Sequence, residues 1–166
     1  MVRTMLISPE VTTSTWEGAA QIYTSSIWEY VGDREWQISD VNAAIRIHLD
    51  TMIDAYFNKD GEPSHGEWTH LAALSILASG YLDETETLIT LCNKQRDYGP
   101  NNIARFGSSG LLLRLHDKVA RLENLLSHGH DARNESLNDT YLDIVGYSVI
   151  GHMLIEGSFP VTIVVG

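Results

Sequence analysis

Three carboxylates recur one helical turn apart near the C-terminal end of the sequence. Glu135, Asp139 and Asp143 lie in the stretch ESLNDTYLDIVGYSVIGHML, where the residues around Asp143 are mostly apolar. Burying a carboxylate costs several kcal/mol unless the group is paired, protonated or bound to a cation. The acidic stripe therefore predicts that a positive charge, either a metal ion or a basic side chain, lies against Asp143.

The stripe is expected on an inward-facing side of a helix. Residues four positions apart lie on one helical face, and this face continues from Asp143 into Gly146 and Ile150. Most other positions of the same stretch are apolar, which is typical of a buried helix. We therefore expect the Asp143 side chain to be at least half buried.

A face of mixed charge precedes the stripe, on a helix expected over residues 110–129. Its charged side chains, spaced for one helical face, are Arg114, Asp117, Lys118 and Arg121. The connection to the acidic helix is short, so the two helices are expected to be antiparallel neighbours.

This juxtaposition leaves two interpretations of Asp143 open. In the first, Asp143 forms a structural ion pair with Arg114 or Arg121. In the second, the acids bind Mg²⁺, with Asp117 as a further carboxylate, because Mg²⁺ is held by carboxylate oxygens, water and substrate phosphates.

Further polar groups lie just upstream, in the stretch KQRDYGPNN. Lys94 could contact a phosphate, Tyr98 could stack on a base, and Asn102 adds an amide. The alternative is a surface turn at Gly99 and Pro100.

The amino-acid composition limits the kinds of partner that the protein is expected to bind. The chain has 166 residues, 43% of them hydrophobic, with 11 Lys and Arg against 22 Asp and Glu, for a net charge of −11. A nucleic-acid-binding protein usually presents a basic face, so nucleic acid is not expected as a partner. Neither a membrane-spanning segment nor a secretory signal is evident. We therefore expect no membrane partner and a cytoplasmic location, in the protein's own cell or in that of an infected host.

Helical periodicity predicts an all-α helical bundle forming a single domain over residues 1–166. Helices are expected at 15–31, 39–57, 68–95 with a break near Gly80, 110–129 and 135–157, with a loop at 58–67 and the main polar interruption at 96–110. Thr15 or Ser14 is the expected N-cap of the first helix, and Ser39 precedes the second. The first helical half covers 15–90, the second half, with the acidic motif, 91–155, and a short β-prone tail 156–166.

The two halves resemble each other. Arg46 aligns with Arg114 and His48 with His116. An internal duplication would predict two helical hairpins around a pseudo-twofold axis, with a four-helix bundle at the centre. Chance similarity between amphipathic helices is the alternative.

These motifs also resemble a known family. NKQRDYGPNN, LLLRLHDKVARLENLL and ESLNDTYLDIVGY, in that order, resemble the nucleotide modification associated domain, type one, of bacteriophages, over roughly residues 90–155. The first half more weakly resembles phage dATP/dGTP diphosphohydrolase-like domains through GDREW, AAIRIHLD and EWTHLAAL. Glu35, Ile47 and Ala73 depart from that second pattern.

Both resemblances imply kinship with all-α nucleotide pyrophosphohydrolases of the MazG and dUTPase kind, in which acidic residues on adjacent helices hold Mg²⁺ against a nucleoside triphosphate. By this resemblance the catalytic residues are Asp117, Glu135, Asp139 and Asp143, and the metal ligands are Glu135, Asp139 and Asp143. The expected nucleotide-binding residues are Lys94, Tyr98, Asn102, Arg114, Lys118 and Arg121.

Three functions remain open on these grounds. The first is a Mg²⁺-dependent (d)NTP pyrophosphohydrolase of a phage nucleotide pathway. The second is a non-catalytic nucleotide-binding protein that sequesters a nucleotide signal of host defence, with basic side chains that hold phosphate without metal. The third is a helical interaction protein with no ligand. A homo-oligomer is expected under the first two, because small helical-hairpin proteins often complete a site or core with a second subunit.

Overall fold

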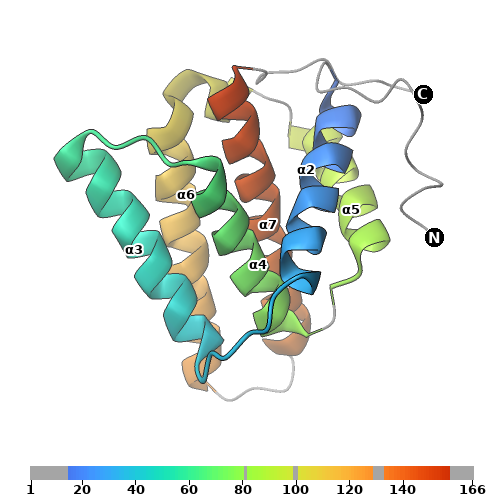
Figure 1. Ribbon diagram of the computed structural model, residues 1–166, viewed down its shortest axis with the longest axis vertical. Helices are drawn as coiled ribbons and strands as arrows, with labels where there is room; N and C mark the ends of the chain where they lie inside the picture. The colour runs from blue at the N-terminus through green and yellow to red at the C-terminus, as the bar shows by residue number, and fades with distance from the viewer. Residues whose placement is uncertain (1–14, 81, 99–100, 129–132, 158–166) are drawn as a thin grey trace.

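The computed structural model describes residues 15–80, 82–98, 101–128 and 133–157, without the side chains of 96–104 and 133–136. These ranges form six helices and no strand: α2 (Trp16–Gly32), α3 (Val41–Lys59), α4 (His65–Ser79), α5 (Glu84–Tyr98), α6 (Asn101–His128) and α7 (Arg133–Glu156) (Figure 1). The predicted all-α bundle is confirmed, whereas most of the predicted β-prone tail lies outside the described residues. None of the helices combines the length and hydropathy needed to cross a bilayer.

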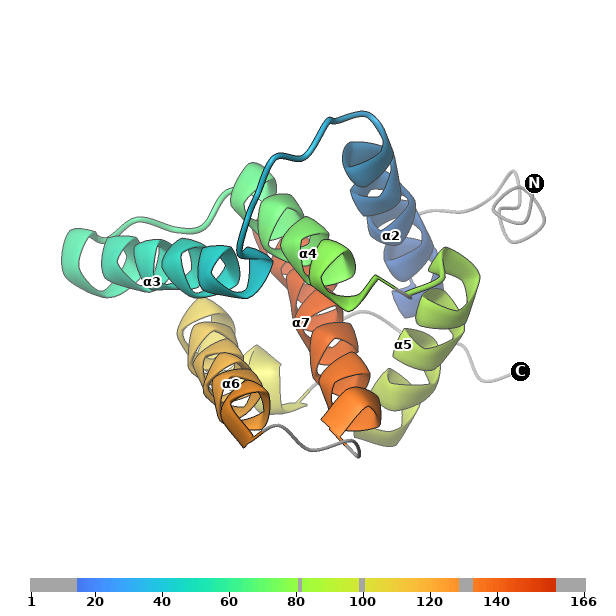
Figure 2. The same cartoon turned by 90° about the horizontal axis from the view of Figure 1, so that it is seen from below.

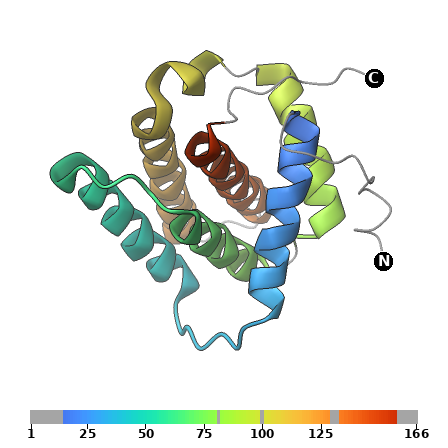
Figure 3. The same cartoon turned by 45° about the horizontal axis from the view of Figure 1, so that its top comes forward.

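Helices α4 and α7 pack against each other at the centre of the bundle. Figure 2 shows α3 and α6 on one side of this pair, and α2 and α5 on the other. The α3–α4 and α6–α7 hairpins each contribute one helix to this central pair. Each of the first three helices also contacts one of the last three in the same order, α2 with α5, α3 with α6 and α4 with α7 (Figure 3).

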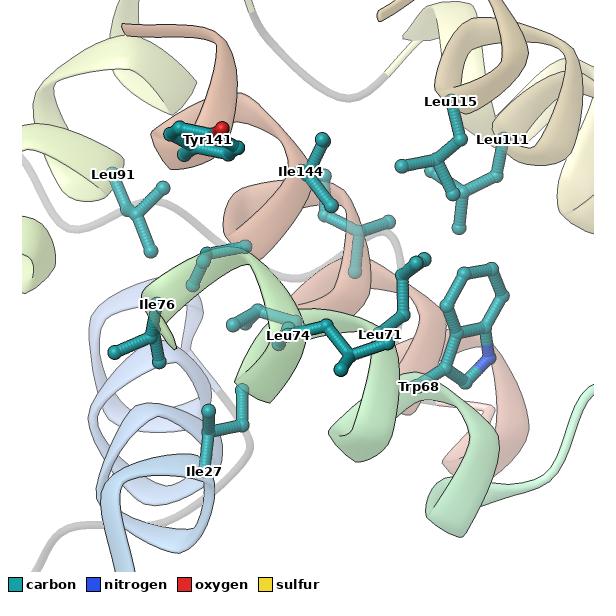
Figure 4. Packing of buried hydrophobic residues seen from close by; sticks show 14 of the residues in the cluster. Ile27, Trp68, Leu71, Leu74, Ile76, Leu91, Leu111, Leu115, Tyr141 and Ile144 are labelled. Atoms are coloured by element: carbon teal, nitrogen blue, oxygen red, sulfur yellow. The ribbon is translucent and has the colours of Figure 1, made fainter. Parts of the chain in front are cut away.

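The hydrophobic core surrounds α4 and α7 and includes buried side chains from all six described helices. Trp68 and Leu71 of α4, Leu111 of α6 and Ile144 of α7 are all buried (Figure 4). Each such side chain stabilises the fold by about 1.5–3 kcal/mol relative to an exposed position. The closest approach is at Gly151, where an added Cβ would lie 2.2 Å from the indole of Trp68. Glycine at this position lets α7 pack directly on the tryptophan ring.

Local capping interactions set the ends of several helices. Thr15 accepts a hydrogen bond from the backbone N–H of Gly18, as predicted for the N-cap of α2. The cap of α3 is Asp40, not Ser39, because the Asp40 carboxylate accepts from the N–H of Ala43. Gly80, with φ of 69°, ends α4 in the left-handed conformation. The predicted break at Gly80 is therefore confirmed.

The polar stretch 96–110 is mostly helical, so the predicted interruption is wrong in its extent. Helix α5 continues to Tyr98, and α6 already begins at Asn101. Within α6 the break is confined to Gly107, whose φ of 59° and ψ of −139° are not helical. Glycine and proline interrupt a helix locally, whereas the polar residues between them are compatible with it.

Candidate functional site

The Asp143 carboxylate on α7 is held by two lysines from two other helices. Lys94 Nζ of α5 donates to Asp143 Oδ1 at 2.7 Å, and Lys118 Nζ of α6 donates to Asp143 Oδ2 at 2.8 Å. The Asp143 side chain is 14% exposed, which confirms that it is more than half buried. Its partners are therefore lysines, not the expected arginines.

Lys94 also contacts Asp139, which precedes Asp143 by one turn of α7. Its Nζ donates to Asp139 Oδ1 at 3.0 Å, so the same ammonium group bridges Asp139 and Asp143. Burial alone would lower the pKa of Lys94, but the hydrogen bonds to Asp143 and Asp139 outweigh burial and raise the pKa above its usual value. We call Lys94, Lys118, Asp139 and Asp143 the lysine–aspartate cluster. The cluster pairs two basic side chains with two acidic ones, so its formal charges balance.

The position between Asp139 and Asp143 suits a cation, because oxygens of both carboxylates lie within 3.0 Å of the Lys94 ammonium. In the described part of the chain, no three or more His, Cys, Asp or Glu side chains are grouped so as to hold a metal ion. Mg²⁺ is nevertheless commonly bound by one or two carboxylates together with water and substrate phosphates. The two aspartates fit the protein's share of such a site.

The other predicted site residues stand apart from this cluster or cannot be placed. Asp117 and Arg121 are exposed and Arg114 is half-buried on α6. Among the described residues, none of the three forms an ion pair with the cluster, whose ion pairs are those of Lys94 and Lys118 with the two aspartates. The side chains of Glu135, Tyr98 and Asn102 lie outside the described part of the structure.

A pocket opens beside the cluster, between α2, α5 and α7. Its empty space is about 370 Å³, part of which is open to solvent, and its lining residues are Trp16, Leu91, Lys94, Gln95, Asp143, Gly146, Tyr147 and Ile150. Four of these come from one face of α7. The expectation that the acidic face turns inward through Gly146 and Ile150 is thereby confirmed.

Sequence reasoning missed Trp16, Gln95 and Tyr147 in the pocket wall. Tyr147 follows Asp143 by one helical turn and Gln95 follows Lys94 directly, so helical spacing could have indicated both. Trp16 carries no such signal, because it reaches the pocket only through the packing of α2 on α5 and α7. Its indole N–H is buried and has no hydrogen-bond partner among the residues that the structure describes.

Residues 94–155 match the nucleotide modification associated domain 1 family. The resemblance noted for the second half is thereby confirmed, and the matched domain contains all four residues of the lysine–aspartate cluster. No curated protein and no solved structure matches the chain. The comparisons thus support neither the resemblance to MazG-type enzymes nor the resemblance of the first half to phage dATP/dGTP diphosphohydrolase-like domains.

Outside residues 94–155, side chains from the first-half motifs GDREW, AAIRIHLD and EWTHLAAL also lie close together, beside Tyr30. The Tyr30 hydroxyl and His70 Nδ1 share a hydrogen bond of 2.8 Å, and the rings of His48 and His70 are 4.8 Å apart. The Arg34 guanidinium stacks on Tyr30, 4.1 Å from the ring centre, and Trp36 packs beside His70. Burial, with smaller contributions from His48 and Arg34, lowers the pKa of His70.

Proposed function

We propose that this protein is a magnesium-dependent nucleotide pyrophosphohydrolase whose phosphate-binding site is the lysine–aspartate cluster. The observation that carries the proposal is the ammonium group of Lys94, which lies between Asp139 and Asp143 as a bound cation would. The match of residues 94–155 to a nucleotide-associated domain supports a nucleotide as the ligand.

The charges of the chain and of the cluster favour a bound cation at the phosphate site. The chain carries a net charge of −11 and the cluster itself is neutral, so a polyphosphate meets no excess positive charge there. With a divalent cation on Asp139 and Asp143, the ammonium groups of Lys94 and Lys118 are free to donate hydrogen bonds to phosphate oxygens. Bound magnesium would supply Lewis-acid stabilisation of the phosphoryl group. In the hydrolysis, water would attack the α-phosphorus and the bond to the α–β bridging oxygen would break. The products would be a nucleoside monophosphate and pyrophosphate.

A second candidate is a protein that binds a nucleotide without cleaving it. Two lysines converge on one carboxylate, and the described residues hold no third acid beside Asp139 and Asp143. In this case Lys94 and Lys118 bind phosphate directly, and Asp143 is their counterion when no ligand is bound.

A hydrolysis assay separates the two candidates. The full chain is incubated with each deoxynucleoside triphosphate and Mg²⁺, and pyrophosphate release is measured. Under the first candidate pyrophosphate accumulates, and both EDTA and Asp143→Asn abolish its release. Calorimetry with a nucleotide in EDTA then tests the second candidate, which predicts that binding persists without metal.

Asp54→Asn is the matched control for Asp143→Asn. Asp54 is an exposed aspartate on α3 that pairs with a lysine, Lys59 Nζ at 3.2 Å, away from the cluster. Its substitution should leave pyrophosphate release unchanged. Absence of turnover with every nucleotide would rule out the hydrolase, and absence of binding as well would rule out both candidates.

A further inference from the structure

The pocket beside the lysine–aspartate cluster combines a charged side with an uncharged one. Lys94 and Asp143 contribute the charged groups of the lining, whereas Trp16, Gln95 and Tyr147 contribute two aromatic rings and an amide. Binding sites for small molecules usually combine such flat apolar surfaces with a few fixed polar groups. The pocket is small, since its empty space of about 370 Å³ includes a part that is open to solvent, and it therefore suits one ring system better than a whole nucleotide.

One polar group of this wall lacks a partner among the described residues. Trp16 is 2% exposed, and its indole N–H donates to no acceptor in the described part of the chain. A buried donor without an acceptor typically costs about 1–3 kcal/mol, so its retention calls for an explanation. An acceptor atom of a bound ligand would provide one.

Gln95 adds the group that could distinguish one ring system from another. It is 7% exposed and precedes Tyr98 by less than one helical turn, next to the cluster residue Lys94 in sequence. Its amide offers a donor and an acceptor side by side, the arrangement that pairs with the edge of a nucleobase. Aromatic surfaces next to it can contact the flat face of a base.

We infer that this pocket is the nucleobase subsite of the nucleotide site, and that Gln95 determines which base is preferred. The inference rests on the proposed binding of nucleotide phosphates at the adjacent cluster. In this arrangement Lys94 and Lys118 contact the phosphates, Gln95 pairs with the edge of the base, and the Trp16 N–H donates to an acceptor on the ligand.

Binding measurements on the full chain with Mg²⁺ test the inference. The probes are the four deoxynucleoside triphosphates and inorganic tripolyphosphate, which carries phosphate without a base. The unaltered protein should prefer one base. Gln95→Leu should weaken binding of that nucleotide on the order of tenfold, because the base edge loses its partner, and leave tripolyphosphate binding unchanged.

Gln21→Leu is the matched control. Gln21 is a buried glutamine of α2 whose side-chain nitrogen also lacks a partner within the described ranges, but it does not line the pocket. Its substitution should leave the affinity for every probe unchanged. In addition, Trp16→Phe should remove the change in tryptophan fluorescence that accompanies nucleotide binding, whereas loss of any other tryptophan should not.

The outcomes separate this inference from the proposed function. If Gln95→Leu binds all four nucleotides as tightly as the unaltered protein, the pocket is not the base subsite, although tripolyphosphate binding would still support the phosphate site. If the unaltered protein binds neither nucleotide nor tripolyphosphate, the proposed function and the base subsite are both wrong.

Discussion

The imidazole rings of His65 and His152 share a hydrogen bond between their Nδ1 atoms, 2.6 Å apart, and so connect α4 to α7. His65 Nε2 donates to Glu156 Oε1 at 2.7 Å, and His152 Nε2 lies 3.2 Å from the Thr69 hydroxyl. If the Thr69 hydroxyl donates to His152 Nε2 and His152 Nδ1 donates to His65 Nδ1, a chain of hydrogen bonds runs from Thr69 through His152 and His65 to Glu156. Tyr23 stacks on His152 from α2, with ring centres 4.9 Å apart.

Acidification should destabilise the protein through His152. Burial, followed by the nearby His65, lowers the pKa of His152 to about 4, against a usual value of 6.5. The folded state therefore binds this proton less readily than the unfolded state, so the stabilisation is complete above pH 6.5 and is lost as the pH falls toward 4. The full loss is at most roughly 3 kcal/mol in the free energy of unfolding. Urea denaturation at several pH values measures it.

Two variants isolate the His152 contribution from that of the carboxylates. In His152→Gln the drop in stability between pH 6.5 and 4 should shrink by the amount due to the histidine. His128→Gln, which replaces an exposed histidine at the end of α6, should keep the original profile. Identical pH profiles for His152→Gln and the unaltered protein would contradict the prediction.

The ion pair between Lys118 and Asp143 should contribute measurably to stability. The pair links α6 to α7 at 2.8 Å, and the Asp143 side chain is only 14% exposed, so solvent screens it less than a surface pair. A double-mutant cycle with Lys118→Met and Asp143→Asn should give a coupling energy of about 1 kcal/mol. Chemical denaturation of the four proteins measures it, and a coupling near zero would mean that Lys94 alone compensates the carboxylate.

Gly151→Ala should destabilise the fold by about 1–3 kcal/mol, because the new methyl group would overlap the indole of Trp68. Gly32→Ala makes the same change at the end of α2, where an added Cβ meets nothing within 4 Å, and should shift stability by no more than about 0.5 kcal/mol. Comparison of the urea denaturation midpoints of the two variants tests this prediction. Equal midpoints would show that Trp68 moves aside without cost.

Arg46→Lys should weaken the contact between α3 and α6. The Arg46 guanidinium donates to both carboxylate oxygens of Glu123 and to Asp50, a geometry that a lysine ammonium cannot reproduce. Because Glu123 is 52% exposed, the expected loss is only about 0.5–1 kcal/mol at low salt, and smaller at high salt. Melting temperatures at two salt concentrations test this, with Lys59→Arg, in an exposed pair on α3, as the neutral control. A loss that does not depend on salt would point to packing of the arginine stem instead.

Predictions from the sequence were most accurate for features that depend on residue spacing within a single helix. The burial of Asp143 and the inward turn of its face through Gly146 follow from spacing within α7 alone. The predicted arginine partners of Asp143 were wrong. Spacing along α6 places Arg114, Lys118 and Arg121 on one broad face, and only the packing of α6 against α7 determines that Lys118 contacts Asp143.

Features that depend on contacts between distant segments were not predictable in the same way. Lys94 reaches Asp143 across the interface of α5 and α7, and Trp16 enters the pocket from the start of α2. The histidine pair joins residues from opposite halves of the chain, and spacing along the sequence carries no trace of it. The polar stretch 96–110 was misjudged for a local reason, since a few glycines and a proline outweighed residues that continue a helix.

The pairing of each helix with its counterpart has a consequence for how the chain can be divided. The backbone passes from the first three helices to the last three only once, after Gly80, and all other contacts between the two halves are noncovalent. A cut after Gly80 would therefore leave the first three helices joined to the last three by noncovalent contacts alone, chiefly those between α4 and α7.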